Sequence, residues 1–297
     1  MSPTAVTESN GTNGVAKKDA LAQLDKVAPL IKRNTVKDVM VAGGFAPLYY
    51  FHLCHSPEVI NLAKLAGYPG IVLNLEHHFT GIETAAQLCF TALNFGLSPV
   101  CIVPSLQSDW ISRLLDNGAQ GIIVPRVGTA EQAQLMVRYS KHRPLGERPL
   151  AFGPQLQFQI PDFIQAQEAQ NLTTMTAPMI ETVEGLENVE QIAAVKGLDA
   201  LFVGVHDLTD DMGIGGQYTA PSVYEALSRI CRAAKANRLY VGFGGLEWHP
   251  QVIDSLRKDF GSTVGFGIAG RDSSFLLNGM KEVVAKFKKV EDGTFKA

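Results

Sequence analysis

Short apolar runs alternate with longer amphipathic segments along most of the chain. Each run is rich in Val and Ile and is apolar at consecutive positions, which is typical of strands buried on both faces of a parallel sheet. The pattern predicts eight strands: Val39–Phe45, Gly70–Leu75, Pro99–Pro104, Gly121–Pro125, Ala177–Ile180, Leu198–Gly204, Leu239–Phe243 and Thr263–Ile268. The segments between them carry apolar residues at helical spacing. Eight helices are predicted: Ser56–Gly67, Ile82–Phe95, Asp109–Asn117, Ala130–His142, Glu184–Val195, Pro221–Ala236, Pro250–Phe260 and Asp272–Lys288.

This alternation predicts an α/β fold, a (β/α)₈ TIM barrel. The structural alternative is an open, doubly wound sheet, although no Gly-x-Gly-x-x-Gly follows the first run to bind a dinucleotide. Residues 1–18 are rich in Ser, Thr, Asn and Gly and predict a disordered tail. A single barrel domain is expected over residues 19–290, with a C-terminal tail at 291–297.

Two segments stand apart from the repeating pattern. Leucines and other apolar residues between Asp19 and Lys32 recur at helical spacing and predict an N-terminal helix that caps one end of the barrel. Arg143–Met175 is too long for a simple connection, so we interpret it as a candidate lid or subunit contact.

Composition narrows the class of protein. The 297 residues are 46% hydrophobic and 19% charged, which allows a sizeable core, and no apolar run reaches the ~18 residues of a membrane span. A formal charge of −3 provides no basic face for nucleic acid. The four cysteines, Cys54, Cys89, Cys101 and Cys231, lack metal-ligand or disulfide-scaffold spacing. They predict free thiols, mostly buried, in a reducing compartment, and we expect a cytoplasmic protein without a signal peptide.

The strand ends supply the candidate chemistry, because the active site of a (β/α)₈ barrel lies at the C-terminal ends of its strands. The residues at these ends are Glu76 and His77 on the second strand, Arg126 on the fourth, Glu181 on the fifth, and His206 and Asp207 on the sixth. The seventh and eighth strands end in glycines. Glu181 and Asp207 on neighbouring strands predict a site for Mg²⁺, which combines a few carboxylates with water and substrate oxygens. His77 could move a proton.

Each of these residues also has an ordinary structural explanation when it is taken alone. Glu181 could cap a helix or face solvent, Asp207 could cap a turn, and His77 could be an exposed loop histidine. The prediction of an active site therefore rests on their convergence at one rim of the barrel.

Three ordered segments resemble the metal-dependent 2-oxo acid aldolases of the HpcH/HpaI type, and the resemblance spans about Gly44 to Gly279. The segments are "HSPEVINLAKLAGYPGIVLNLEH", "LLDNGAQGIIVPRVGTAEQA" and "MIETVEGLENVEQIAAVKGLDALFVGVHDLTDDMG". The resemblance implies a TIM barrel with carbon–carbon lyase activity on a 2-oxo acid, through an enolate that the metal stabilises. It also implies homo-oligomers, hexamers or trimers of dimers, in which C-terminal helices are exchanged.

By the same resemblance, Glu181 and Asp207 would hold a divalent metal, most simply Mg²⁺, with Mn²⁺ or Co²⁺ as alternatives. His77 would be the catalytic acid or base, and Glu76 would orient metal-bound water. Gly204 and the nonstandard His206 would contribute to binding of the metal's water or of the substrate, and His78 is a further nonstandard polar residue nearby.

Two positions depart from the family pattern. Asn74 stands where the family has Asp, and Ile102 stands where the family has an arginine that contacts the substrate. We hypothesise that Arg126 supplies the missing cation from the adjacent strand; the alternative is an outward-facing arginine in a salt bridge. These departures keep open a biosynthetic enzyme like macrophomate synthase, which couples decarboxylation to carbon–carbon bond formation. They also keep open a non-catalytic barrel.

Overall fold

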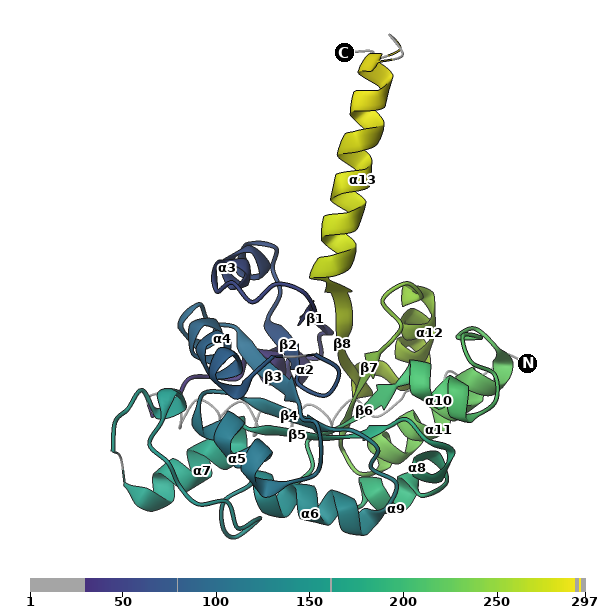
Figure 1. The fold of residues 1–297 in the computed structure, drawn as a ribbon. Helices are drawn as coiled ribbons and strands as arrows, with labels where there is room; N and C mark the ends of the chain where they lie inside the picture. The colour runs from purple at the N-terminus through teal and green to yellow at the C-terminus, as the bar shows by residue number, and fades with distance from the viewer. Residues whose placement is uncertain (1–29, 79, 161, 292–293, 295–297) are drawn as a thin grey trace, which may run out of the picture.

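Eight parallel strands pair in sequence order, and the first also pairs with the last, so the sheet closes into a barrel (Figure 1). The structure is a computed structural model that describes residues 30–78, 80–160, 162–291 and 294. The strands are β1 (Ala46–Phe51), β2 (Gly70–Asn74), β3 (Ser98–Ile102), β4 (Gly121–Val124), β5 (Met175–Ile180), β6 (Ala200–Gly204), β7 (Tyr240–Gly244) and β8 (Val264–Arg271). The predicted (β/α)₈ barrel is confirmed, and the β1–β8 pairing rules out the open sheet.

Helices overlap all eight predicted helical segments, and in the described part of the chain three further helices lie outside those segments. Most of the helices surround the barrel (Figure 1). The helices are α2 (Thr35–Val41), α3 (Glu58–Leu65), α4 (Ile82–Asn94), α5 (Ser108–Asp116), α6 (Ala130–Ser140), α7 (Phe163–Thr173), α8 (Val183–Glu187), α9 (Val189–Ala193), α10 (Val205–Asp211), α11 (Pro221–Ala236), α12 (Pro250–Phe260) and α13 (Asp272–Glu291). Two 3₁₀ turns, η1 (Pro154–Leu156) and η2 (Gly261–Thr263), complete the set for the described residues.

The first strand was predicted in the wrong place. Residues 39–41 belong to α2, and the strand begins only at Ala46. Asn34 caps α2 by accepting the Lys37 N–H, at 3.0 Å, and apolar residues at Val36 and Met40 face one side of the helix, so the segment has a helix start and a helical stripe. An apolar run this short fits either a strand or a buried helix, and here the cap decides for the helix.

Helix α2 closes the N-terminal end of the barrel. Its Val36 and Met40 are fully buried and pack with the residues that fill the barrel, among them Leu48, Phe202 and Phe266. The capping helix predicted over Asp19–Lys32 lies almost wholly outside the described residues, so that prediction stays untested. Within the described chain, α2 takes the capping position.

The long connection Arg143–Met175 lies at the same end and is not a lid over the strand ends predicted to form the site. Gln155 donates to Leu115 O at 3.1 Å, at the end of α5, and to Ala119 O, just before β4 starts. Lys141 donates to Thr174 O at 2.6 Å, just before β5 starts. The lid interpretation is therefore wrong, because these contacts anchor the connection at the N-terminal ends of the strands. The subunit-contact interpretation remains a prediction.

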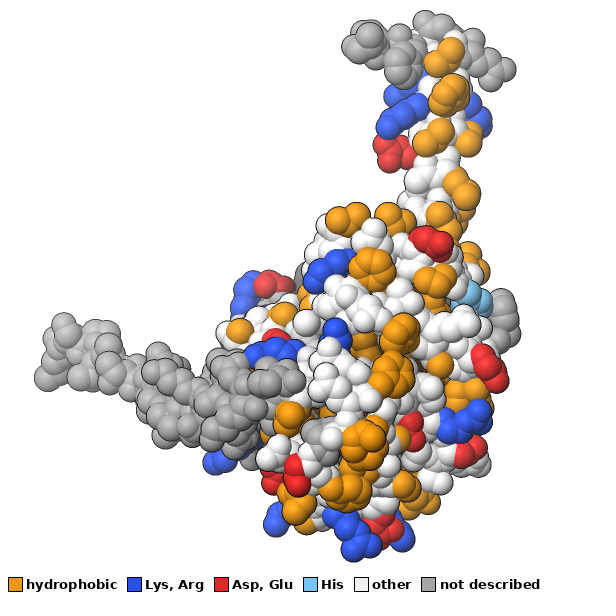
Figure 2. Space-filling model, turned by 90° about the vertical axis from the view of Figure 1, so that its left-hand side faces the viewer, with side chains coloured by type: hydrophobic (Ala, Val, Ile, Leu, Met, Phe, Trp, Pro, Cys, Tyr) orange, Lys and Arg blue, Asp and Glu red, His pale blue; other side chains and the backbone are white. Residues whose placement is uncertain are grey.

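Helix α13 projects away from the barrel (Figure 1). Its apolar side chains are exposed along its length, and Figure 2 shows them as an orange stripe. The larger exposed ones are Phe275, Leu276, Leu277, Met280, Val283, Val284, Phe287 and Val290.

None of the described helices is both long and apolar enough to cross a membrane. The four cysteines are free, and Cys89, Cys101 and Cys231 are buried, as predicted.

Candidate active site

A cavity of about 280 Å³ opens at the C-terminal ends of the strands. Its apolar lining includes Ile102, Met179, Phe202 and Ile268. Every predicted site residue except Arg126 lines it: Glu76, His77, Glu181, Gly204, His206 and Asp207. Residues that are far apart in the sequence therefore meet at one rim, as the barrel rule requires.

Glu181 is the most constrained of these residues, with only 5% of its surface exposed. The backbone N–H of Arg126 donates to Glu181 Oε1 at 2.7 Å. A Cβ on Gly204 would lie 2.6 Å from Glu181 Oε2, so the absence of a side chain at this position makes room for the carboxylate. Burial raises the pKa of Glu181 to about 7 despite the Arg126 hydrogen bond, and the charges of Asp207 and Glu76 add to the rise.

The carboxylates Glu76, Glu181 and Asp207 concentrate negative charge on one part of the cavity wall. Among the described residues, no three His, Cys, Asp or Glu side chains are placed to hold a metal by themselves. The set nevertheless fits a divalent cation whose remaining ligands are water and substrate oxygens, since Mg²⁺ is usually held by one or two carboxylates. Glu76 Oε1 makes no hydrogen bond among the described residues, and Arg126 provides its positive neighbour, with Nη2 at 3.3 Å.

His77 and Arg126 both approach Glu76. His77 Nε2 lies 3.5 Å from Glu76 Oε2, and the His77 side chain is 56% exposed, so it is open to both solvent and cavity. Arg126 Nη2 lies 3.3 Å from Glu76 Oε1. The Arg126 side chain is 68% exposed and does not line the cavity. Arg126 was predicted to place a cation at the substrate. In this arrangement its charge can affect the cavity only through its pairing with Glu76.

Asn74 organises a second polar network. Its Oδ1 accepts the backbone N–H groups of Glu76 and His77, at 2.8 and 3.1 Å. Its Nδ2 lies 2.9 Å from Tyr50 Oη, which lies 2.9 Å from His78 Nε2. Burial lowers the pKa of His78, and the nearby His52 and His77 add to the shift. His78 is therefore neutral over most of the physiological range, and its Nε2 can accept a hydrogen bond.

On the other side of the carboxylates, His206 Nδ1 contacts the hydroxyl of Tyr218, at 2.7 Å. Burial lowers the pKa of His206, and the charge of Arg271 adds to this, against the opposing charge of Asp207. Gly245 has a positive φ of 88°, and a Cβ there would lie 3.0 Å from the His206 ring, so a glycine is needed beside this histidine.

The sequence analysis missed Tyr50, His52 and Arg271, all of which line the cavity. Tyr50 and His52 were missed because the first strand was predicted to end at Phe45, whereas it runs to Phe51. Arg271 was missed because the last run was predicted to end in glycines. The signal was present, since "GIAGRDSS" places an arginine directly after those glycines.

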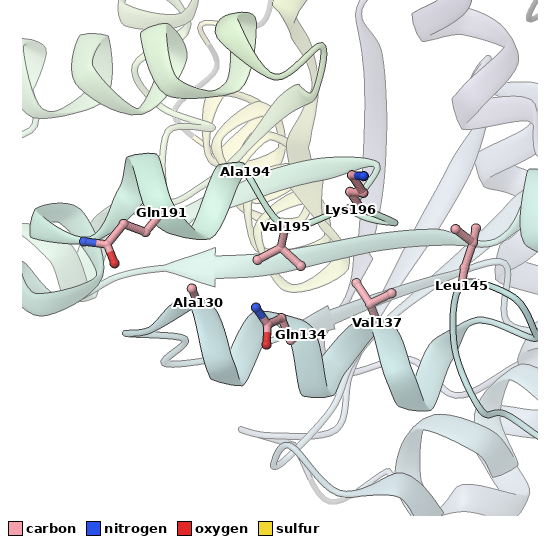
Figure 3. Close-up of a pocket in the computed structure, with 8 residues that line it drawn as sticks. All are labelled: Ala130, Gln134, Val137, Leu145, Gln191, Ala194, Val195 and Lys196. Atoms are coloured by element: carbon pink, nitrogen blue, oxygen red, sulfur yellow. The ribbon is translucent and has the colours of Figure 1, made fainter.

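A second hollow, of about 450 Å³, lies outside the barrel between α6 and α9 (Figure 3). Its lining includes Gln134 and Val137 from α6, Gln191 from α9, and Leu145. Among the described residues that line it, Lys196 alone is ionisable. The hollow therefore lacks a cluster of carboxylates and imidazoles like the one that lines the rim cavity.

Comparisons with known proteins agree on the family and the fold. The family model described as HpcH/HpaI aldolase/citrate lyase matches residues 48–270. The 4-hydroxy-4-methyl-2-oxoglutarate aldolase of Chaetomium globosum is 29% identical, over 87% of this chain and 96% of its own. The 4-hydroxy-2-oxo-heptane-1,7-dioate aldolase of Klebsiella pneumoniae is 31% identical, over 86% and 94%. The crystal structure of an HpcH/HpaI aldolase from Desulfitobacterium hafniense superimposes with a TM-score of 0.76 at 26% identity, covering 85% of this chain and 96% of its own.

Proposed function

The chain belongs to the HpcH/HpaI aldolase/citrate lyase family, and from this premise we propose that it is a carbon–carbon lyase of the aldolase type acting on a 2-oxo acid. The observation that carries the proposal is that Glu181, Asp207 and His77 line one cavity at the strand ends. The 2-oxo acid aldolases similar to this chain cover most of its length, which supports the same reaction class.

We propose a divalent metal, most simply Mg²⁺, held by Glu181 and Asp207. When bound, it would polarise the 2-oxo and carboxylate oxygens of the substrate and stabilise negative charge that develops on them. Glu181 is oriented for this role by the Arg126 N–H. Burial, and then the charges of Asp207 and Glu76, raise its pKa to about 7, so metal binding would have to displace a proton below that pH.

His77 is the residue that we assign to proton transfer. It would take the proton from the 4-hydroxyl group of the substrate as the C3–C4 bond breaks, and would give a proton to C3, which becomes the methyl carbon of pyruvate. Glu76, 3.5 Å away, holds the His77 ring and presents its second oxygen to Arg126. For Arg126 we propose an electrostatic role. Its positive charge would neutralise Glu76 and so offset part of the negative charge that develops in the cavity.

Pyruvate release tests this proposal. Wild-type protein with Mg²⁺ should release pyruvate from 4-hydroxy-4-methyl-2-oxoglutarate or from 4-hydroxy-2-oxo-heptane-1,7-dioate, and a chelator should stop it. His77→Ala should lower turnover by at least about 100-fold, whereas His249→Ala, outside the cavity lining, should not. Folded protein that binds no Mg²⁺, Mn²⁺ or Co²⁺ and releases no pyruvate would contradict the proposal and favour a non-catalytic barrel. Consumption of oxaloacetate alone would point to decarboxylation, as in the biosynthetic alternative.

We also propose that the protein is a homo-oligomer. Helix α13 has 20 residues, so it is about 30 Å long, and its apolar stripe contacts little of its own barrel. An exposed apolar stripe of this length usually marks a surface that another chain covers. Exchange of α13 between subunits would cover it.

A further inference from the structure

We propose that Arg271 anchors an anion subsite at the β8–β1 side of the cavity, and that this subsite receives the second carboxylate of a 2-oxo dicarboxylic acid. The inference rests on the proposed function for the identity of the substrate's other end. It adds a residue at the end of β8, where the sequence predicted only glycines.

The position of Arg271 comes from the strand register. Arg271 is the last residue of β8 and pairs with Tyr50 of β1. Its guanidinium carbon lies 5.6 Å from the centre of the Tyr50 ring, so the planar cation packs over the aromatic face. Both residues line the cavity. The guanidinium is therefore held beside the substrate space by the barrel itself.

A buried carboxylate fixes the Arg271 side chain. Glu247, which follows β7 and is 2% exposed, pairs with Arg271 Nη2. This pairing offsets part of the charge, but it occupies one edge of a planar group that has five N–H donors. The Arg271 Nε is buried and finds no acceptor among the described residues. Arg271 is thus oriented by Glu247 and Tyr50 while it keeps donors for a further anion.

The other groups around Arg271 are imidazoles. The rings of His52 and His78 have centres 4.5 Å apart and are tilted by 43°, and both line the cavity. Besides Glu247, the nearby acid is Asp272, the next residue along the chain, which accepts the backbone N–H groups of Leu53 and Cys54, at 2.9 and 2.7 Å. The Asp272 carboxylate is therefore bound by the backbone that follows β1.

The cavity consequently has two chemically different sides. Glu181 and Asp207 follow β5 and β6, where a divalent cation fits, and a guanidinium with two imidazoles lies at β8, β1 and β2. Glu76, which also follows β2, is paired with Arg126. A molecule with a chelating 2-oxo acid at one end and a carboxylate at the other matches both sides. A guanidinium is well suited to the second carboxylate because two parallel N–H groups meet its two oxygens. The apolar side chains of Ile102 and Ile268 suit the carbon chain between them.

Binding of two matched ligands tests the inference. 2-Oxoglutarate and 2-oxopentanoate share a five-carbon 2-oxo acid chain, and only the first has a second carboxylate. Calorimetry with Mg²⁺ should show that wild-type protein binds 2-oxoglutarate at least about tenfold more tightly, as a charge-assisted hydrogen bond implies. Equal affinities would overturn the inference.

The variants separate Arg271 from general charge effects. Arg271→Met together with Glu247→Met removes both charges of the pair, so that no buried carboxylate is left alone, and should make the two affinities equal. The matched control, Arg229→Met with Glu190→Met, removes an exposed Arg–Glu pair outside the barrel with a 2.9 Å contact and should keep the difference. Arg271→Lys, which keeps the charge and loses the planar fork, should shrink the difference at least threefold. A double variant that folds and keeps the full difference would overturn the inference.

This comparison also separates the inference from the proposed function. It measures binding without turnover, so a protein that releases no pyruvate can still show or lack the preference for two carboxylates. Conversely, pyruvate release with equal affinities for the two ligands would retain the lyase and remove the Arg271 subsite.

Discussion

The side-chain amide of Asn74 donates a hydrogen bond to Tyr50, with Nδ2 and Oη 2.9 Å apart. The direction of this bond is settled, because Asn74 Oδ1 is already turned toward two backbone N–H groups. The Tyr50 hydroxyl thus accepts from Asn74 and can direct its own proton to His78 Nε2. The resemblance implies an Asp at this position, and an Asp would accept from Tyr50 instead. Asn74 therefore sets the opposite direction of this hydrogen bond and carries no charge.

Asn74→Asp should raise the pKa of His78. The new carboxylate would accept the Tyr50 proton and add a negative charge near the imidazole, whereas burial and the neighbouring His52 and His77 now lower that pKa. NMR titration of the His78 ring nitrogens measures the change. Tyr50→Phe, which removes the hydroxyl without adding charge, should not raise the pKa in the same way. An unchanged His78 pKa in Asn74→Asp would show that the network is not coupled.

Binding of Mg²⁺ should release a proton below pH 7. Burial, and then the charges of Asp207 and Glu76, raise the pKa of Glu181 to about 7, and a metal ligand must be deprotonated. Affinity should rise about tenfold per pH unit below 7 and level off above it. Calorimetry at pH 6 in buffers of different ionisation enthalpy measures the released proton, and proton-neutral binding there would contradict the prediction.

The same shift affects stability without metal. The folded-state pKa of Glu181 lies above its usual value near 4.5, so the folded protein binds the extra proton. Stability should therefore fall as pH rises from about 4.5 to 7. Glu181→Gln should flatten this slope in urea unfolding, because the amide does not titrate.

Arg126→Ala should lower turnover about tenfold if its charge reaches the substrate through Glu76, 3.3 Å away. Its backbone N–H, which orients Glu181, is retained in this variant, so Mg²⁺ affinity should stay near the wild-type value. The control is Arg232→Ala, which removes a second exposed arginine that pairs with a glutamate, Glu225 at 2.8 Å. Turnover that matches the wild type would leave Arg126 as a surface salt bridge.

Asp199→Asn should destabilise the fold by about 3–5 kcal/mol. Lys37 and Lys141 both pair with Asp199, at 2.6 and 2.8 Å, and Lys141 is 2% exposed. Burial raises the pKa of Asp199, but the charges of Lys141 and Lys37 outweigh it and lower the pKa to about 2.

This stabilisation should be complete above about pH 4 and lost as the pH falls toward 2. Urea unfolding at neutral pH measures the loss in Asp199→Asn. Asp254→Asn, in an exposed pair with Lys258, should leave the free energy of unfolding nearly unchanged. Because Asp199 lies before β6 starts, at the end of the barrel opposite the cavity, turnover at low temperature should be retained.

Val284→Asp with Phe287→Asp should break the proposed oligomer, because it places two charges in the exposed apolar stripe of α13. Light scattering of the full chain measures the mass. Lys286→Ala, at a polar position where Lys286 pairs with Glu282, should keep the oligomer. A wild-type protein that is monomeric at micromolar concentration would contradict the proposal.

Local patterns were sufficient for most of the fold. Seven of the eight apolar runs overlap the observed strands, since a strand covered on both faces is apolar at consecutive positions. The exception is Val39–Phe45, whose first residues belong to α2. Asn34, five residues before this run, is the N-cap of that helix, and the prediction did not take it into account. That single shift also hid Tyr50 and His52, because a wrongly placed strand points to the wrong strand end.

The sequence by itself determined the barrel and the acidic side of its cavity, because strand periodicity is local and the carboxyl ends of parallel strands meet at one rim. That rule places Glu181, Asp207 and His77 at the rim, and all three line the cavity. Tertiary structure decided the opposite side of the cavity. The contact of Arg271 with Tyr50 and Glu247, the proton direction set by Asn74, and the raised pKa of Glu181 all depend on neighbours far away in the sequence. Charge and hydrogen bonding act through space, so these features exist only once the barrel has closed.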